Sequence, residues 1–222
     1  MTEDLWSWES RLQQSGLVKV AGVDEAGRGP LAGPVVAAAV ILPPAPECRL
    51  YLPALCESKQ LSPKRRVELF ELIQFVAISI GIGRTGVKYI DRFNILEATR
   101  VAMKRALANL TKTPDHVLVD AVCLDGIPCP TEAVIHGDLK CACIAAASII
   151  AKVDRDRIMI ELDQMYPGYA FARNKGYGTA EHLAALARLG PSPIHRWTFR
   201  PVRLAGHKRM GDNVQQDGRE TR

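Results

Sequence analysis

Two adjacent carboxylates, Asp24 and Glu25, stand directly before a glycine-rich turn that contains a single arginine. Divalent cations prefer carboxylate oxygens as ligands, whereas phosphates bind arginine and backbone N–H groups. Residues 23–34, with the sequence VDEAGRGPLAGP, therefore hold the groups that a ligand carrying both metal and phosphate requires. The alternative is a polar β-turn with a surface acid pair. Apolar runs at 17–23 and 35–42 favour a site, because they place a charged loop between two buried strands.

Two more aspartates, Asp120 and Asp138, each end a short apolar run typical of a buried strand. If these strands end at one edge of a sheet, their carboxylates meet those of Asp24 and Glu25 and repel them unless cations intervene. Oxygen donors without an adjacent His or Cys favour Mg²⁺ or Mn²⁺ over zinc. Successive residues in a strand point to opposite faces, so we expect Glu25 to lie in the turn or to bind through its backbone carbonyl.

The elements that position these residues alternate between strand and helix patterns. We expect strands at about 17–24, 34–42, 75–83, 116–120 and 133–138, with the first two antiparallel. Helices are expected from Ser62, an N-cap before proline, and over about 95–110, 144–165 and 180–189. Strands followed by alternating helix and strand predict a mixed sheet with helices packed on its faces.

The composition fits a globular protein without a membrane span. The chain has 222 residues, of which 47% are hydrophobic, and no apolar run approaches the roughly 20 residues that cross a bilayer. The N-terminus is acidic and lacks a signal pattern, so we expect a cytoplasmic protein. The six cysteines contain no CxxC pair and are expected to act as small apolar residues rather than zinc ligands or disulfides.

A net charge of +5 indicates a weak preference for polyanions. Basic residues gather before one expected helix and again near the C-terminus, where they suit a phosphate backbone or form a solvated face: Lys59, Lys64, Arg65 and Arg66, then His195, Arg196, Arg200, Arg203, Lys208 and Arg209. Residues 81–86 match GxGxxG, but 87–92 do not indicate a convincing crossover helix and no acid-terminated strand follows. We therefore do not expect a dinucleotide site.

Several motifs occur together, in matching order and spacing, between Leu17 and Val202: VDEAGRGPLAGP at 23–34, ESKQLS at 57–62, VD at 119–120, GDLK at 137–140, AASIIAKV at 146–153, YPGY at 166–169 and NKGYGT at 174–179. They closely resemble bacterial ribonuclease HII. The resemblance implies an α/β, ribonuclease H-like fold, with a mixed five-stranded sheet flanked by helices and a helical C-terminal part. The expected organisation is an N-terminal extension (1–16), a catalytic domain (17–203) and a disordered tail (204–222), with the domain divided near 165 into a core and a substrate-binding part.

The resemblance also implies a reaction. The family cleaves the RNA strand of RNA–DNA hybrids and nicks duplex DNA 5′ of an embedded ribonucleotide, leaving 3′-hydroxyl and 5′-phosphate ends. By resemblance, the catalytic, metal-binding residues are Asp24, Glu25, Asp120 and Asp138. They would hold Mn²⁺ or Mg²⁺ ions, of which one activates the attacking water and another stabilises the departing 3′ oxygen.

Substrate contacts follow from the same resemblance. Gly27, Arg28 and Gly29 would recognise the ribonucleotide 2′-hydroxyl through backbone atoms, because a side chain would block close approach. Tyr177 would stack on the sugar at the RNA–DNA junction. Phosphate contacts are expected from Ser58, Lys59, Lys140 and Lys175.

One alternative is a nucleic-acid-binding protein that keeps the fold without catalysis. The intact acids argue against it, because anions facing a polyanion weaken binding unless metal intervenes. The tail shows no sliding-clamp motif, and we expect a monomer that binds RNA–DNA hybrid and ribonucleotide-containing duplex DNA.

Overall fold

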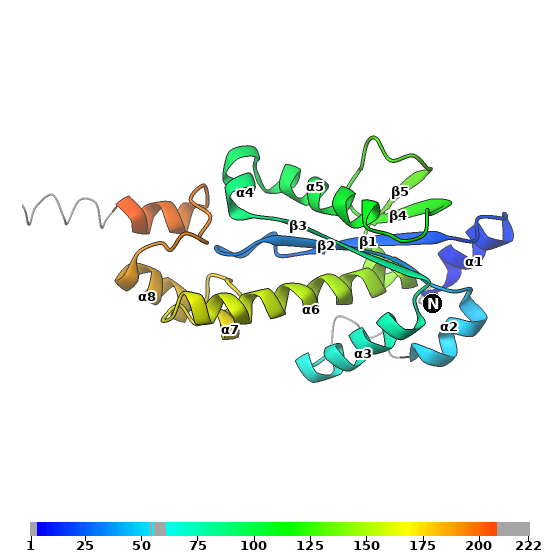
Figure 1. Ribbon diagram of the computed structural model, residues 1–222, viewed down its shortest axis with the longest axis horizontal. Coiled ribbons are helices and arrows are strands. Elements are labelled where there is room, and N and C mark those ends of the chain that lie inside the picture. Colours follow the sequence, from blue (N-terminus) through cyan, green and yellow to red (C-terminus); the bar gives the residue numbers. More distant parts are fainter. Residues whose placement is uncertain (1–3, 54, 56–60, 208–222) are drawn as a thin grey trace, which may run out of the picture.

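The computed structural model describes residues 4–53, 55 and 61–207 of the chain. A five-stranded sheet of order β3-β2-β1-β4-β5 forms its centre (Figure 1). β1 pairs antiparallel with β2, β2 pairs antiparallel with β3, and β4 and β5 continue the sheet in parallel. The expected mixed five-stranded sheet is confirmed, with strands β1 (Val20–Ala26), β2 (Val35–Ile41), β3 (Ser79–Thr85), β4 (His116–Asp120) and β5 (Thr131–Val134).

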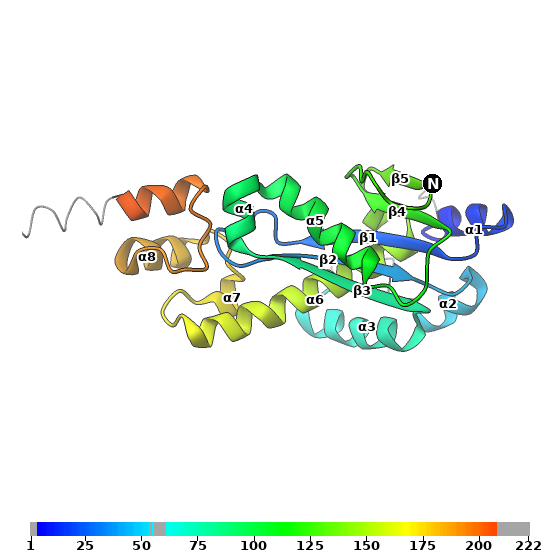
Figure 2. The ribbon, with the colours of Figure 1, turned by 45° about the horizontal axis from the view of Figure 1, so that its top comes forward.

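Helices cover both faces of the sheet, as Figure 2 shows from a second side. α6 (Ala142–Met165) crosses one face with α3 (Pro63–Val76) beside it, and α5 (Ile95–Ala108) covers the other. At one end of the molecule lie α1 (Ser7–Gln14) and α2 (Ala45–Tyr51); at the other lie α7 (Phe171–Asn174) and α8 (Ala180–Leu189) (Figures 1 and 2). The remaining short elements are α4 (Val87–Phe93) and the 3₁₀ turn η2 (Gly137–Leu139).

The side-chain alternation of β2 divides the core into two layers. Val36, Ala38 and Val40 pack with the apolar side of α6. Val35, Ala37, Ala39 and Ile41 pack with α5 on the opposite face. All seven residues of β2 are buried, which explains why this stretch is a continuous apolar run rather than an alternating one.

Glycines allow the helices to approach the sheet closely. A Cβ on Gly22 of β1 would lie 2.1 Å from the carbonyl carbon of Cys143 in α6. A Cβ on Gly81 or Gly83 of β3 would lie 2.0 Å from a carbonyl oxygen of α5. The first two glycines of the GxGxxG stretch therefore lie inside a strand and make room for a helix.

Several boundaries differ from the sequence-based expectation. Phe75 and Val76 end α3 instead of beginning β3. Phe75 is 82% exposed, so the prediction of a buried strand from its apolar side chain is wrong. A helix, α4, does form at 87–93 and buries Ile90. Helical structure also covers 200–207, beyond the expected start of the tail, whose remainder lies outside the described residues.

The expected start of α3 and the expected end of α8 are confirmed. The Ser62 hydroxyl accepts a hydrogen bond from the Arg65 N–H at 3.3 Å, so Ser62 is the N-cap of α3. α8 ends at Leu189, as Gly190 predicted. The described part of the chain contains no helix both long and apolar enough to cross a membrane. Among the described cysteines, Cys123, Cys129, Cys141 and Cys143 have free thiols; Cys56 lies outside the described residues.

Gly22→Ala should destabilise the fold by about 3 kcal/mol or more, because the added methyl group meets backbone atoms of α6 that cannot rotate away. Urea unfolding followed by circular dichroism measures the effect. Gly86→Ala is the matched control, because its Cβ would have no atom within 4 Å, and it should cost less than about 1 kcal/mol. Equal stability losses in the two variants would contradict close β1–α6 packing.

Candidate active site

Asp24 and Asp120 are neighbours on adjacent parallel strands. Val23 of β1 is level with Val119 of β4, so the residues that follow them are also level. Val23 and Val119 both pack on the α5 side, which places the next side chains on the side of α6. There the hydroxyl of Ser148, in α6, hydrogen-bonds to the Asp24 carboxylate. The expected convergence is thus present for these two aspartates.

Of the two alternatives for Glu25, a position in the turn is wrong: Glu25 is the sixth residue of β1 and pairs with Ala37. Antiparallel pairing with β2 continues to Ala26, which keeps Glu25 in the strand. Its Oε1 lies 3.3 Å from the Arg28 guanidinium, and its Oε2 is buried with no hydrogen-bond partner among the described residues. The Glu25 N–H donates to the Asp24 carboxylate at 2.7 Å.

Asp138 is likewise not at a strand end. β5 stops at Val134, His136 adopts a left-handed conformation with φ 57°, and Asp138 follows in η2. This turn is nevertheless tied to the acidic cluster, because the N–H of Gly137 donates to Asp120 Oδ1 at 2.8 Å. Asp138 itself is buried. The short 3₁₀ turn η2, rather than the end of β5, therefore brings the fourth acid to this end of the sheet.

Burial and mutual repulsion raise the pKa values of two of the acids. Burial raises the pKa of Asp24 well above its ordinary value, and the nearby carboxylates of Glu25 and Asp120 raise it further. Burial also raises the pKa of Glu25, an effect that Arg28 opposes and Asp120 reinforces. Three of the four predicted acids therefore act on one another. Even so, no three His, Cys, Asp or Glu side chains within residues 4–53, 55 and 61–207 form a ready-made metal site.

Two buried arginines hold the 27–34 turn from beneath. Arg196 is fully buried, and its guanidinium donates to the carbonyls of Gly27 (2.6 Å), Arg28 (2.9 Å) and Gly33 (2.9 Å). Arg155, in α6, donates to two carbonyls at the base of the turn, Ala32 (3.2 Å) and Pro34 (3.0 Å), and to the carbonyl of Lys175 in the loop after α7 (2.9 Å). The turn is thus fixed by charged donors bound to its backbone oxygens.

The glycines of the turn have different roles. Gly27 has φ +95°, and a Cβ there would lie 2.1 Å from Arg155 Nε, so only glycine fits. A Cβ on Gly29 would meet nothing closer than a ring carbon of Tyr177, at 3.7 Å. The fold itself therefore leaves space above Gly29, and Tyr177 borders that space. Sequence reasoning placed these two residues at one site, and the structure brings them together.

The cavity at this place has a volume of about 270 Å³ and is bordered mainly by basic side chains. Tyr177 is half exposed at its edge, with the Arg155 guanidinium 6.0 Å from the ring centre. The Lys175 ammonium group donates to the Ala172 carbonyl at 2.6 Å. The residues that line this cavity are Ala26, Gly27, Arg66, Lys152, Arg155, Asp156, Lys175 and Tyr177.

Sequence reasoning missed three of the contributing residues, Ser148, Lys152 and Arg155. Lys152 donates to the Ser148 hydroxyl at 2.6 Å, and that hydroxyl in turn reaches Asp24. The signal was available: the three residues recur at helical spacing, four and then three residues apart, so they share one face of α6.

Other predicted contacts have different outcomes. His195 and Arg196 are fully buried, so they do not belong to an exposed C-terminal basic patch, whereas Arg200 and Arg203 are exposed. Lys140 directly follows η2 and is half buried. Ser58, Lys59, Lys208 and Arg209 lie outside the described residues.

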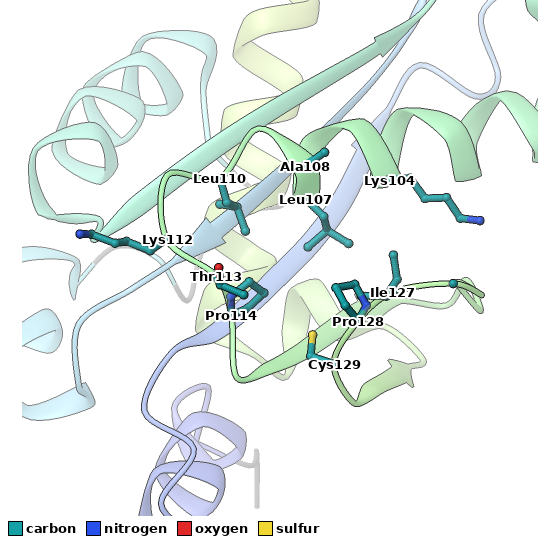
Figure 3. A pocket seen from close by; sticks show the side chains of 11 residues that line it. Lys104, Leu107, Ala108, Leu110, Lys112, Thr113, Pro114, Ile127, Pro128 and Cys129 are labelled. Carbon is teal, nitrogen blue, oxygen red and sulfur yellow. The ribbon is translucent and has the colours of Figure 1, made fainter.

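A second, more apolar cavity lies elsewhere, beside the C-terminal end of α5 (Figure 3). Its volume is about 380 Å³, and Leu107, Leu110 and Ile127 line it, with Lys104 and Lys112 at its rim. It lies on the α5 side of the sheet, whereas Asp24 contacts α6. This cavity is therefore separate from the acidic cluster.

Comparison with known proteins agrees with this geometry. A family model described as ribonuclease HII matches residues 21–202. The ribonuclease HII of Geobacter sulfurreducens is 56% identical over 199 residues, which cover 90% of each chain. The crystal structure of ribonuclease H2 from Pyrococcus horikoshii OT3 superposes with a TM-score of 0.75 at 28% identity, over 86% of this chain and 98% of that one.

The fold extends to more distant proteins. The crystal structure of Bst-RNase HIII in complex with Mn²⁺ has a TM-score of 0.67 at 18% identity, over 87% of this chain and 70% of that one. At that identity the likeness concerns the fold alone. With the family match over most of its length and a close relative of the same kind, the chain belongs to the ribonuclease HII family of ribonuclease H enzymes.

Proposed function

We propose that the protein cleaves the RNA strand of RNA–DNA hybrids and nicks duplex DNA on the 5′ side of a single embedded ribonucleotide. The products would carry 3′-hydroxyl and 5′-phosphate ends. Family membership supports ribonuclease H activity in general. The finer proposal depends on one observation, namely that a buried acidic cluster adjoins a rigid glycine turn and a half-exposed tyrosine.

We propose Asp24, Glu25, Asp120 and Asp138 as ligands of Mn²⁺ or Mg²⁺. Their donor atoms are all oxygens, which these cations prefer. The buried Glu25 Oε2 lacks a partner among the described residues, and burial together with repulsion among the acids raises the pKa values of Asp24 and Glu25. Both features fit a site that positive charge completes. When bound, the ions would supply an activated water and stabilise charge on the leaving oxygen.

The turn is suited to recognise a ribose through its backbone. Arg196 binds the carbonyls of Gly27 and Arg28 from inside the protein. The N–H groups of Arg28 and Gly29 donate no hydrogen bond to any described residue. We infer that these N–H groups and the space above Gly29 receive the 2′-hydroxyl-bearing sugar, and that the Tyr177 ring stacks on it. A DNA sugar lacks this hydroxyl and would leave its partner unpaired.

The basic residues around the cavity would bind the phosphates that flank the scissile bond. We propose this role for Lys140 and Lys175, and for Ser58 and Lys59 from the motif at 57–62. Lys152 and Arg66 line the same cavity as Lys175 and Tyr177, which supports a positively charged path for the backbone. We also propose that 17–165 forms the core and 166–203 helps to hold the substrate.

The protein should nick a duplex that contains one ribonucleotide when Mg²⁺ or Mn²⁺ is present, and not when EDTA is added. Asp120→Asn should lower the nicking rate by more than roughly 100-fold, because even loss of a residue that only supports a ligand costs 10- to 100-fold. Denaturing gels with end-labelled strands report the rate and the cleavage position. Binding without any metal-dependent nick would favour the non-catalytic alternative.

Asp24→Asn should stabilise the metal-free protein, because it removes a buried charge that repels its neighbours. The pKa of Asp24 is raised in the folded state, so its carboxyl holds a proton at low pH and the cost of the charge appears as pH rises. In EDTA at pH 8 the unfolding midpoint should rise by about 2–4 °C, and by less at pH 4. Calorimetry measures both. Asp154→Asn, which breaks the ion pair with the half-exposed Arg84, should give no rise. A pH-independent gain in Asp24→Asn would argue against a cost of the buried charge.

Tyr177→Ala should reduce the preference for a single ribonucleotide over a continuous hybrid by about tenfold, or ~1.4 kcal/mol, because the ring no longer packs on the sugar at the junction. Tyr177→Phe retains the ring and should retain most of the preference. The ratio of kcat/KM values on the two substrates measures it. An unchanged ratio in Tyr177→Ala would remove this residue from the site.

A further inference from the structure

His182 and His195 form a buried pair behind Tyr177 that neither the acidic cluster nor the phosphate path uses. His182 lies in α8 and His195 in the segment after it, and both are fully buried. Their Nε2 atoms are 3.0 Å apart, which is hydrogen-bond distance. Tyr169 and Phe171 pack around the two rings, with ring-centre distances of 4.9 Å for Tyr169–His195 and 5.3 Å for Phe171–His182.

The atoms at both ends of the pair determine where the ring protons are. At one end two groups of Ser192 contact His195 Nδ1: the hydroxyl at 2.8 Å, which can donate or accept, and the backbone N–H at 2.9 Å, which can only donate. Nδ1 of His195 is therefore the acceptor, and the proton of the neutral ring is on Nε2. At the other end His182 Nδ1 lies 2.9 Å from the Tyr177 carbonyl, which can only accept. His182 therefore carries its proton on Nδ1.

The two independent assignments agree at the centre. His195 Nε2–H donates, and His182 Nε2, which is unprotonated, accepts. A continuous directed chain results, from Ser192 N–H through both rings to the Tyr177 carbonyl. Burial lowers the pKa of His182, and burial together with His182 lowers the pKa of His195 to about 4, so both rings are neutral at pH 7.

We propose that His182 and His195 are positioning residues that hold the Tyr177 backbone, and thereby its ring, in register with the 27–34 turn. The proposal rests on the role of Tyr177 given above. The Tyr177 carbonyl also accepts a hydrogen bond from the Thr179 N–H at 2.8 Å, so two donors share this one oxygen. The second donor, His182, comes from the interior rather than from the loop itself.

The same histidine segment is attached to the turn that faces Tyr177. His195 forms an isolated β-bridge with Ala32. On either side of it, the Gly33 N–H donates to the Ile194 carbonyl and the Arg196 N–H to the Leu31 carbonyl, both at 2.9 Å. His195 thus contacts the 27–34 turn through its backbone. Its ring reaches the Tyr177 carbonyl by way of His182. The pair therefore links the turn and the tyrosine in a fixed geometry.

Ring-nitrogen NMR of the wild-type protein tests the chain without any nuclease activity. At pH 7 a ¹⁵N-histidine spectrum should show His182 protonated on Nδ1 only and His195 on Nε2 only, with His182→Asn and His195→Gln used for assignment. The opposite neutral form of either ring, or a doubly protonated ring, would overturn the proposal. Since the spectrum needs neither substrate nor metal, it stands even if the wild-type protein fails to nick.

Matched variants of His182 test the consequence for Tyr177. His182→Asn places an amide nitrogen near the position of Nδ1 and keeps a donor for the Tyr177 carbonyl, whereas His182→Leu removes it. The kcat/KM preference for a single ribonucleotide over a hybrid should fall about fivefold in His182→Leu, as for one lost hydrogen bond, and stay within about twofold in His182→Asn.

Three outcomes decide the variant experiment. A full preference in His182→Leu would overturn the proposal, as would an equal loss in His182→Asn and His182→Leu. Loss in His182→Leu with rescue in His182→Asn would support it. If His182→Leu does not fold, the ring-nitrogen spectrum of the wild-type protein decides alone.

Discussion

Burial of the Arg196 guanidinium beneath the 27–34 turn is the interaction on which the arrangement of this site depends. No carboxylate bonds to it within the described chain; backbone carbonyls of Gly27, Arg28 and Gly33 do. Burial, followed by the neighbouring charge of Arg155, lowers the pKa of Arg196 to about 9. Hydrogen bonds to a charged donor contribute about 1.5–3 kcal/mol each, which offsets part of the desolvation cost and fixes the turn.

Close packing determines where the second arginine can act. Gly22 lets α6 lie against β1 with no intervening side chain. From that position α6 delivers Ser148 to Asp24 and Arg155 to the base of the turn. One helix thereby contacts both the acidic cluster and the glycine turn. The distance between the two parts of the site is therefore set by a rigid element rather than by a loop.

Much of the fold and part of the site could be predicted from the sequence. Asp24 and Asp120 were placed correctly together because apolar strand patterns locate strand ends. The positions of Glu25 and Asp138 could not be read from local patterns. Pairing with β2 extends β1 through Glu25, and the left-handed His136 ends the strand run before Asp138.

Arg155, Arg196 and His195 were missed or misplaced because charged and polar residues are usually exposed, and only tertiary contacts show that these are buried. The apolar residues at 75–78 predicted the start of a strand wrongly for the opposite reason: apolar residues are usually buried, but Phe75 is exposed.

The bonds between Arg196 and the 27–34 turn also have a consequence for the order of synthesis. Residues 27–34 are made early, yet the guanidinium that binds their carbonyls comes from residue 196. During translation the turn can gain these bonds only after most of the polypeptide has left the ribosome. A nascent chain that already contains all four acids therefore still lacks the hydrogen bonds that fix the turn until residue 196 has been made and has folded against it.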